Sequence, residues 1–345
     1  MELVKESQLR DIIEQVTPLV ESNPAPAVRQ PPTDPRERDA WFAEVAKLRT
    51  TQQARTAEMI RAATAGAPAV DGVDATEVRI PVAGTCGWAG CAECTAGSIS
   101  ATVYRPVGAS DMPVYLHFHG GGFWIGGGEV LQVTGAVHAT RARELGVVVV
   151  DVDYRMAPEH KFPIPVEDCY TAVAWAVSHA ADLGVDPSRI AVGGGSAGAT
   201  LVAAVALMSR DRGGPILAGQ VLNIPAIDSG CSTESMRLFG EGYVMTRRHA
   251  FEMWEMYLTT PADAHDPYAS PVHASTLRGL PPTLVVLGDY DVLRDEGNAY
   301  ARRLVDEGVT VTMRRFPQAH GAALPEVGPA TERLIDAFLR TYLLP

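Results

Sequence analysis

Short apolar stretches alternate with helical patterns along most of this chain. Mostly apolar runs bounded by polar residues, at 115–118, 189–192 and 283–288, are typical of buried strands. Residues 199–208 (ATLVAAVALM) predict a helix, and residues 309–316 alternate apolar and polar positions as an edge strand does. The order of these elements predicts an alternating β/α core.

Two helical patterns precede this core. Residues 6–21 place apolar side chains at helical spacing, and a proline-rich connector follows them. A second helix is predicted over residues 34–63. Asp34 suits its N-cap, Pro35 its first helical position, and Glu37 the third position after the cap.

The composition limits the class of protein and its partners. Of the 345 residues, 46% are hydrophobic, which is enough for one large core. Lys and Arg number 29 against 41 Asp and Glu, so the formal net charge is −12. This excess of acid disfavours nucleic acid and anionic membrane surfaces as partners. The sequence has no basic start followed by an apolar stretch and no apolar run of about 18 residues, so we expect a cytoplasmic protein.

A single serine stands in a G-x-S-x-G frame between a predicted strand and a predicted helix. Residues 192–199 read VGGGSAGA, with Ser196 in the frame. A sharp strand-to-helix turn leaves no space for side chains two positions on either side, and it exposes the serine hydroxyl above the sheet. The pattern predicts that Ser196 is a nucleophile. A glycine-rich turn without catalytic function is the alternative interpretation.

A glycine tract follows another predicted strand. Residues 115–122 read YLHFHGGG, and unhindered glycine amides are suited to stabilise an oxyanion. We predict that the N–H groups of Gly121, Gly122 and Ala197 form an oxyanion hole. A phosphate-binding loop is the alternative, but the sequence lacks G-x-x-x-x-G-K-S/T and lacks a helix-opening G-x-G-x-x-G with a later acidic residue.

A histidine and several carboxylates follow at the ends of later strands. Asp291 lies in an acidic loop after the strand at 283–288, and His320 follows the last predicted strand. His320 would serve as general base and then general acid, and Asp291 would hold its tautomer. The order serine, aspartate, histidine is that of hydrolases with a nucleophile elbow. Asp289, Asp291 and Asp295 could instead cap the next helix, and a histidine before glycine is commonly a loop residue.

Six ordered motifs resemble those of the hormone-sensitive-lipase-like group of α/β-hydrolases, the bacterial family IV esterases. The resemblance covers the chain from about residue 104 to its C-terminus. The motifs are His119–Gly122 (HGGG), Asp153–His160 (DYRMAPEH), Gly194–Gly198 (GGSAG), Tyr268–Pro271 (YASP), Asp291–Glu296 (DVLRDE) and His320–Gly321 (HG).

This resemblance implies an α/β-hydrolase fold, in which a mostly parallel central sheet is flanked by helices and carries a helical cap. It implies an acyl-serine mechanism with the triad Ser196, Asp291 and His320, and it selects Asp291 among the neighbouring carboxylates. Two positions depart from the family pattern. Gly195 stands where an acidic residue usually precedes the serine, and Ala322 stands where an aromatic residue is common.

The resemblance also implies the domain organisation. Residues 1–70 would form an N-terminal helical cap segment, and residues 71–345 the catalytic domain with a cap insertion at about 227–260. We expect five aromatic residues to line the substrate pocket: Phe123, Trp124, Trp41, Phe42 and Tyr243. Aromatic residues at helical spacing are also common in ordinary packing, which is the alternative interpretation.

Three cysteines, Cys86, Cys91 and Cys94, crowd into one short segment. A zinc site needs a fourth ligand, and neither Cys169 nor Cys231 supplies a second C-x-x-C pair. We therefore interpret the segment as a hairpin loop rich in glycine and alanine. A disulfide within this loop is an alternative that the sequence does not decide. No metal and no cofactor are expected.

The expected activity is that of a serine carboxylesterase acting on small neutral esters with short- to medium-chain acyl groups. Two alternative activities remain. Hydrolysis of amides, lactones or carbamates and acyl transfer to an alcohol pass through the same kind of tetrahedral intermediate, so the motifs do not distinguish them from ester hydrolysis. A non-catalytic ligand-binding receptor on an esterase scaffold is the alternative from another class. The expected partner is a small-molecule ester, and the resemblance implies a homodimer that pairs through residues 309–315.

Overall fold

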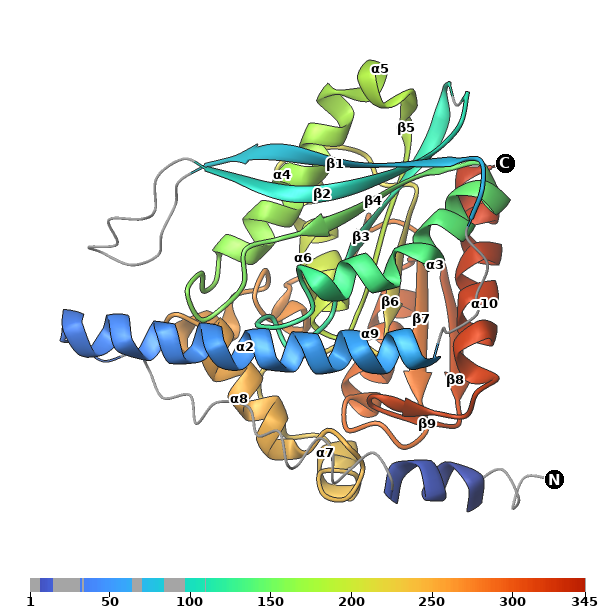
Figure 1. Ribbon diagram of the computed structural model, residues 1–345. Helices are drawn as coiled ribbons and strands as arrows, with labels where there is room; N and C mark the ends of the chain where they lie inside the picture. The colour runs from blue at the N-terminus through green and yellow to red at the C-terminus, as the bar shows by residue number, and fades with distance from the viewer. Residues whose placement is uncertain are drawn as a thin grey trace.

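An eight-stranded sheet forms the centre of the computed structural model (Figure 1). The structure describes residues 7–14, 32, 34–63, 70–83, 97–108 and 110–344. The strands of this sheet are β1 (Val73–Val82), β2 (Gly97–Pro106), β3 (Met112–Phe118), β4 (Val148–Asp153), β5 (Val185–Gly195), β6 (Gly219–Asn223), β7 (Thr283–Gly288) and β8 (Val311–Phe316). Their spatial order is β1-β2-β4-β3-β5-β6-β7-β8.

The sheet is mostly parallel, as the family resemblance implied. All neighbours from β4 to β8 in the spatial order pair in parallel. Only β1 with β2 and β2 with β4 are antiparallel. Parallel strands end at the same edge of a sheet, and ligands bind beyond the carboxyl ends of such strands. The loops after β3, β5 and β7 therefore meet at one edge.

From residue 35 on, the helices are α2 (Pro35–Ala63), α3 (Glu129–Leu145), α4 (Ile164–Ser178), α5 (Ala180–Leu183), α6 (Ala197–Asp211), α7 (Glu234–Leu238), α8 (Arg247–Tyr257), α9 (Arg294–Asp306) and α10 (Val327–Leu343). Of these, α3 and α10 pack on one face of the sheet, and α4, α6 and α9 pack on the other. Short elements are the 3-10 turns η1 (Pro261–His265) and η2 (Pro271–His273) and a hairpin of β9 (Gln318–Ala319) and β10 (Ala322–Ala323). Within the described ranges, no helix is long and apolar enough to cross a membrane.

The alternation of side chains along the strands divides the core into two layers. Val149 of β4 and Leu284 of β7 lie in one apolar cluster with Leu339 of α10. The next residue of each strand, Val150 and Val285, lies in the other cluster, which includes α4, α6 and α9. Successive strand residues point to opposite faces, so an all-apolar strand must be covered on both.

Several element boundaries agree with the sequence prediction. The strand predicted at 283–288 is β7, and the helix predicted at 34–63 is α2, which begins at Pro35. Asp34 caps this helix, because its Oδ1 accepts the N–H of Arg36 at 2.8 Å and that of Glu37 at 3.4 Å. β8 begins two residues later than the predicted strand, since the N–H of Val309 instead closes the end of α9 by donating to Leu304 O.

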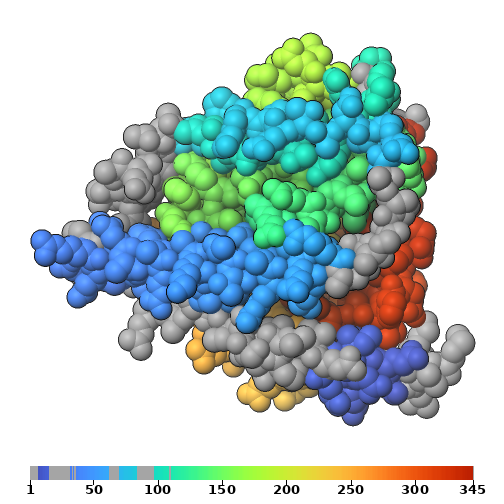
Figure 2. Space-filling view, in the orientation of Figure 1, coloured from blue at the N-terminus to red at the C-terminus, as the bar shows by residue number. Residues whose placement is uncertain are grey.

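The N-terminal helical patterns pack against the rest of the chain. Residues 7–14 are helical, and Leu9 and Ile13 are buried in a cluster with Val244 and Ala322. Residues 15–21, which the prediction included in this helix, lie outside the described residues. α2 runs as a long rod below the β1–β2 hairpin in the orientation shown (Figures 1 and 2).

Candidate active site

Ser196 occupies the sharp turn between β5 and α6. Its backbone has φ 54° and ψ −120°, a region that residues other than glycine rarely adopt. The flanking glycines make this turn fit, because a Cβ at Gly194 would lie 2.5 Å from Phe118 O and one at Gly198 would lie 2.1 Å from the same atom. The turn therefore packs directly on the end of β3. This close packing stabilises the unfavourable backbone conformation of the serine.

The structure brings Ser196, His320 and Asp291 into one hydrogen-bonded chain. Ser196 Oγ lies 2.9 Å from His320 Nε2, and His320 Nδ1 lies 2.9 Å from Asp291 Oδ2. Asp291 follows β7, and His320 stands in the tight turn between β9 and β10. The other oxygen of Asp291 accepts the N–H of Leu293 at 2.8 Å, so the buried carboxylate is hydrogen-bonded at both oxygens.

The neighbouring carboxylates have other partners. Asp289 Oδ1 pairs with Arg315 at 2.6 Å on the surface. Asp295 accepts the N–H of Ser235 at 2.8 Å and pairs with Arg294. Of the three aspartates in this loop, only Asp291 reaches His320.

The predicted oxyanion donors lie beside Ser196. Gly121 and Gly122 have φ values of 107° and 59°, which favour glycine. Both line a cavity together with Ser196 and His320. Ala197 follows the serine at the first position of α6. No hydrogen bond to another described residue is recorded for the N–H groups of these three residues, so they are available to a ligand oxygen.

The segment Asp153–His160 supports the glycine loop. Tyr154 stacks on His119 with ring centroids 4.2 Å apart, and its hydroxyl donates to His119 O at 2.8 Å. His119 Nδ1 lies 2.7 Å from Gly120 O. Burial lowers the pKa of His119, which keeps this imidazole neutral. Tyr154 of this motif therefore holds the start of the glycine loop in place.

A cavity of about 270 Å³ opens above the serine. Its lining residues are Gln52, Gly121, Gly122, Trp124, Ile125, Ser196, Val244, Met245, His249, Met253, Met256 and His320. They come from α2, from the loops after β3 and β5, from residues 244–256, which include most of α8, and from the turn between β9 and β10. Most of the side chains around the serine are apolar.

Of the five aromatic residues expected in the pocket, the structure brings Trp124 to this cavity. Phe123 lies elsewhere, because its φ of 67° turns the ring into the core, where it stacks on Tyr257 with centroids 3.8 Å apart. Trp41 and Phe42 pack edge to face on each other, with ring centroids 5.1 Å apart. Tyr243 packs with Phe239 and Tyr290. These four residues are not among the lining of the cavity.

The prediction missed most of the lining that α8 contributes. His249, Met253 and Met256 stand at i, i+4 and i+7, which places them on one face of the helix. A capping box sets the start of α8, since Thr246 Oγ1 accepts the N–H of His249 and His249 Nδ1 accepts the N–H of Thr246. The helical spacing was visible in the sequence, but nothing there showed which face meets the serine.

The first turn of α9 anchors the segment that leads into α7 and α8. Glu296 Oε1 accepts the N–H of Ile227 at 2.7 Å and that of Asp228 at 3.2 Å. The side chain is almost completely buried, and this burial raises the pKa of Glu296 well above its usual value. The motif residue Glu296 is therefore a structural anchor.

The cysteine segment lies outside the described residues, as Cys86, Cys91 and Cys94 all do. The described cysteines are Cys169 and Cys231, which are buried free thiols. Burial raises the pKa of both thiols, to about 12 for Cys231.

Fold and site together define a class of protein, the hydrolases that place a serine on a nucleophile elbow of an α/β sheet. A family model described as alpha/beta hydrolase fold matches residues 115–324, so the chain belongs to the α/β-hydrolase family. This confirms the membership that the motifs predicted, in the hormone-sensitive-lipase-like group.

Similar proteins carry the names of esterases. The carboxylic ester hydrolase LipN of Mycobacterium tuberculosis is 39% identical over 248 residues, which are 70% of this chain and 62% of that protein. An arylesterase of Saccharolobus solfataricus is 38% identical over 243 residues, which are 70% of this chain and 77% of that protein.

Solved structures of esterases share the fold. A thermostable carboxylesterase cloned from a metagenomic library superposes with a TM-score of 0.75 and 36% identity, covering 86% of this chain and 98% of that chain. A hyperthermophilic esterase from the archaeon Pyrobaculum calidifontis gives a TM-score of 0.78 at 33% identity, covering 96% of this chain and 97% of that chain. The chain is an ester-hydrolysing enzyme of this family.

Proposed function

We propose that this enzyme hydrolyses carboxylic esters through an acyl intermediate on Ser196. The single observation that carries the proposal is the hydrogen-bonded chain from Ser196 through His320 to Asp291, which lies at a cavity beside unoccupied backbone N–H groups. A serine hydroxyl needs a base within hydrogen-bond reach, and His320 Nε2 meets that condition at 2.9 Å.

The reaction has two halves. Ser196 Oγ attacks the ester carbonyl carbon while His320 Nε2 takes its proton, and the charge on the carbonyl oxygen is stabilised by Gly121, Gly122 and Ala197. Each such donor is typically worth about 10²–10³ in rate. The protonated His320 then gives its proton to the leaving alkoxide, which departs as the alcohol. A water molecule that His320 deprotonates attacks the acyl-serine. As this second intermediate collapses, His320 returns the proton to Ser196 Oγ, and the acid is released.

The substrate is proposed to be a small neutral ester with a short- to medium-chain acyl group. The cavity of about 270 Å³ is slightly smaller than the usual ligand pocket, which has at least about 300 Å³. Its walls near the serine include Ile125, Val244, Met253 and Met256, and the lining contains no Asp, Glu, Lys or Arg. Such a surface favours an apolar acyl chain over a charged one.

The division into a cap and a catalytic domain is also a proposal. Residues 1–70 supply Gln52 of α2 to the cavity, and the insertion at about 227–260 supplies Met253 and its neighbours on α8. Both segments thus contribute walls above Ser196, as a cap would. The catalytic domain is then residues 71–345 without that insertion.

A p-nitrophenyl ester series from acetate to palmitate, run on wild type and on Ser196→Ala, tests the function. Activity that peaks at short chains and disappears in the variant would support the proposal. Hydrolysis of a long-chain triglyceride emulsion at a comparable rate would contradict the acyl-length part. A folded wild type that hydrolyses no ester would favour an amide or lactone substrate, or the receptor function. Product analysis with a competing alcohol would distinguish acyl transfer from hydrolysis.

A homodimer is proposed through β8, which is the outer strand of the sheet. Met313 on this strand and Val305 on the adjacent α9 are exposed apolar side chains. An unpaired strand edge next to an apolar surface is suited to pair with a second copy. Light scattering of wild type and Met313→Asp tests this, because a dimer in wild type and a monomer in the variant are expected.

A cytoplasmic location is proposed as well. It is supported by the described cysteines, Cys169 and Cys231, which are free thiols, as is usual in a reducing compartment. Fractionation of the native host, with an antibody against the protein, would test this location.

A further inference from the structure

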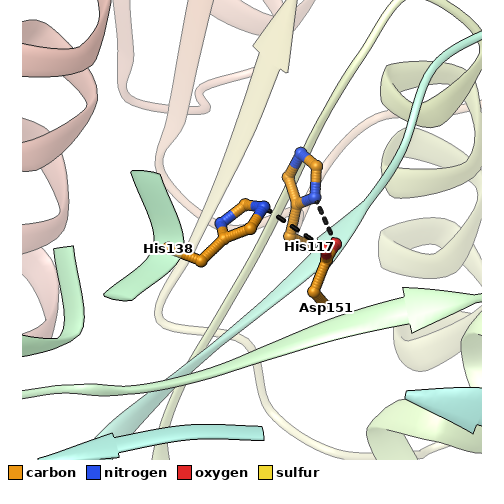
Figure 3. A group of neighbouring side chains, drawn as sticks. All are labelled: His117, His138 and Asp151. Carbon is orange, nitrogen blue, oxygen red and sulfur yellow. Dashed lines mark hydrogen bonds and ion pairs between the residues drawn. The ribbon is translucent and has the colours of Figure 1, made fainter. Parts of the chain in front are cut away.

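Three side chains that lie far apart in the sequence meet inside the core (Figure 3). His117 lies on β3, His138 on α3 and Asp151 on β4. His117 Nδ1 is 2.8 Å from Asp151 Oδ1, and His138 Nε2 is 3.4 Å from Asp151 Oδ2. Both imidazole rings therefore direct a nitrogen at one carboxylate, and a ligand atom of each residue lies within 4.8 Å of the others.

Two of the three side chains are buried, His117 is 22% exposed, and some polar atoms of the cluster lack partners. The side chain of Asp151 is 1% exposed and that of His138 is 5% exposed. Among the described residues, neither Asp151 Oδ2 nor His138 Nδ1 has a hydrogen-bond partner. A buried carboxylate oxygen without a hydrogen-bond donor lowers the free energy of unfolding, unless a cation binds to it. The mechanism proposed above uses none of these three residues.

We propose that His117, His138 and Asp151 bind a divalent transition-metal ion of the zinc class. Imidazole nitrogens and carboxylate oxygens are established zinc ligands. With bonds of about 2.0–2.2 Å, a tetrahedral site separates its ligand atoms by roughly 3.3 Å. The two nitrogen–oxygen separations of 2.8 Å and 3.4 Å lie on either side of that value, and all three ligand atoms lie within 4.8 Å of one another.

A cavity of about 240 Å³ reaches one member of this cluster, His117. His117 lines it, together with Gln53 and Thr56 of α2, Thr134 of α3 and Gly121 of the oxyanion loop. A zinc ion with three protein ligands keeps a fourth position, which water commonly takes. The cavity next to His117 provides space for that water, and its wall is shared with the loop beside the active site.

The charge around the cluster suits a divalent cation. Arg141 lies close enough to His138 to interact with it electrostatically. Its guanidinium is paired with Glu332 and with Asp336. These two carboxylates offset the positive charge of Arg141, so the negative charge of Asp151 is left for a bound cation.

Zinc titration of the full-length enzyme tests the site. Chelator-treated protein is dialysed against Zn²⁺, and bound metal is measured by elemental analysis. We expect one tightly bound ion per chain in wild type, and at least about 100-fold weaker binding in Asp151→Asn and His138→Gln. Circular dichroism and thermal unfolding identify variants that have lost their fold.

Two control variants exclude other zinc sites. The exposed pair His265 and His273 has imidazole centroids 5.0 Å apart, so His265→Asn/His273→Asn removes a surface site. The triple change of Cys86, Cys91 and Cys94 to serine removes the cysteine segment. Tight binding that persists in both controls supports the proposal. Loss of the ion in either control, or unchanged affinity in Asp151→Asn, would overturn it.

Anomalous diffraction gives an answer that does not depend on any variant. Crystals of wild type soaked in Zn²⁺ should show an anomalous peak within bonding distance of His138 Nε2 and Asp151. Ordered crystals without a peak at this cluster, or wild-type protein that binds no stoichiometric Zn²⁺, would show that the cluster is a buried hydrogen-bonded network only.

Discussion

Asp291 holds His320 in one tautomer. His320 Nδ1 lies 2.9 Å from Asp291 Oδ2, and an ionised carboxylate can only accept a hydrogen bond, so Nδ1 carries the proton. Nε2 therefore presents its lone pair to Ser196 Oγ at 2.9 Å. The buried Asp291 is held in turn by the N–H of Leu293. This arrangement gives the imidazole the orientation that a general base needs.

Replacing the carboxylate should stop catalysis while leaving the fold intact. We expect Asp291→Asn to lower kcat by about 10³–10⁴, because the amide can donate to Nδ1 and favour the wrong tautomer. Asp289→Asn is the matched control, since Asp289 pairs with Arg315 on the surface. Esterase kinetics on both variants check this. A comparable loss in Asp289→Asn would contradict the assignment of Asp291.

The glycines around Ser196 should differ sharply in their tolerance of a methyl group. A Cβ at Gly198 would lie 2.1 Å from Phe118 O, whereas one at Gly195 meets nothing closer than 3.9 Å. We expect Gly198→Ala to lower the free energy of unfolding by about 3 kcal/mol and Gly195→Ala to change it by less than about 0.5 kcal/mol. Urea unfolding measures both. Equal effects would mean that the turn is looser than described.

Met253 should set the acyl length that the cavity accepts. It lines the cavity from α8, and Met253→Ala removes part of the wall opposite Gly122. We expect the ratio of kcat/KM for octanoate over acetate to rise by about tenfold. Phe251→Ala, which truncates an exposed residue of the same helix, should leave the ratio unchanged. A fixed ratio in Met253→Ala would show that acyl chains bind elsewhere.

Arg49 should tie α2 to the active-site loops. Its guanidinium donates to Trp124 O and Ala157 O, both at 2.7 Å, and to Glu159 at 2.8 Å. We expect Arg49→Met to cost about 1–3 kcal/mol in the free energy of unfolding. Arg61→Met removes an exposed ion pair between the same helix and α3, and should cost less than about 0.5 kcal/mol. Chemical denaturation distinguishes the two, and equal midpoints would refute the anchoring role.

Glu296 should make the protein less stable as the pH rises. Burial raises the pKa of this carboxyl above its ordinary value of 4.5, so the folded state retains a proton that the unfolded state loses. The resulting stabilisation is complete below about pH 4.5 and declines as the pH rises towards the folded pKa. Glu296→Gln cannot ionise and should lose less stability over that range. Unfolding free energies measured across pH check this, and parallel profiles would contradict it.

The sequence predicted the sheet and the loops that carry the candidate catalytic residues through the same signal, and the family resemblance then selected Asp291 among its neighbouring carboxylates. β7 has the predicted bounds because a continuous apolar run between turn residues has few alternatives to a buried strand. Asp291 and His320 follow such strands, and parallel strands bring their carboxyl ends to one edge. Their meeting with Ser196 therefore follows from strand order, although 124 residues separate the serine from the histidine.

The pocket was less accessible to prediction. Phe123 directly precedes Trp124, yet one ring enters the core and the other lines the cavity. The difference comes from a backbone dihedral, the positive φ of Phe123, that no residue pattern signalled. The sequence also did not predict that Met253 and Met256 line the cavity. The face of α8 that lies towards the serine depends on how the helix packs against the rest of the protein.

By itself, the sequence determined the fold class, the family and the candidate catalytic groups, because these depend on local periodicity, turn chemistry and the order of motifs along the chain. Only the tertiary structure decided which apolar side chains surround the serine and which polar residues meet inside the core. His117, His138 and Asp151 come from three elements, and their contact depends on register and helix rotation. Those are properties of the packed chain, set by many weak contacts at once, and no short stretch of sequence records them.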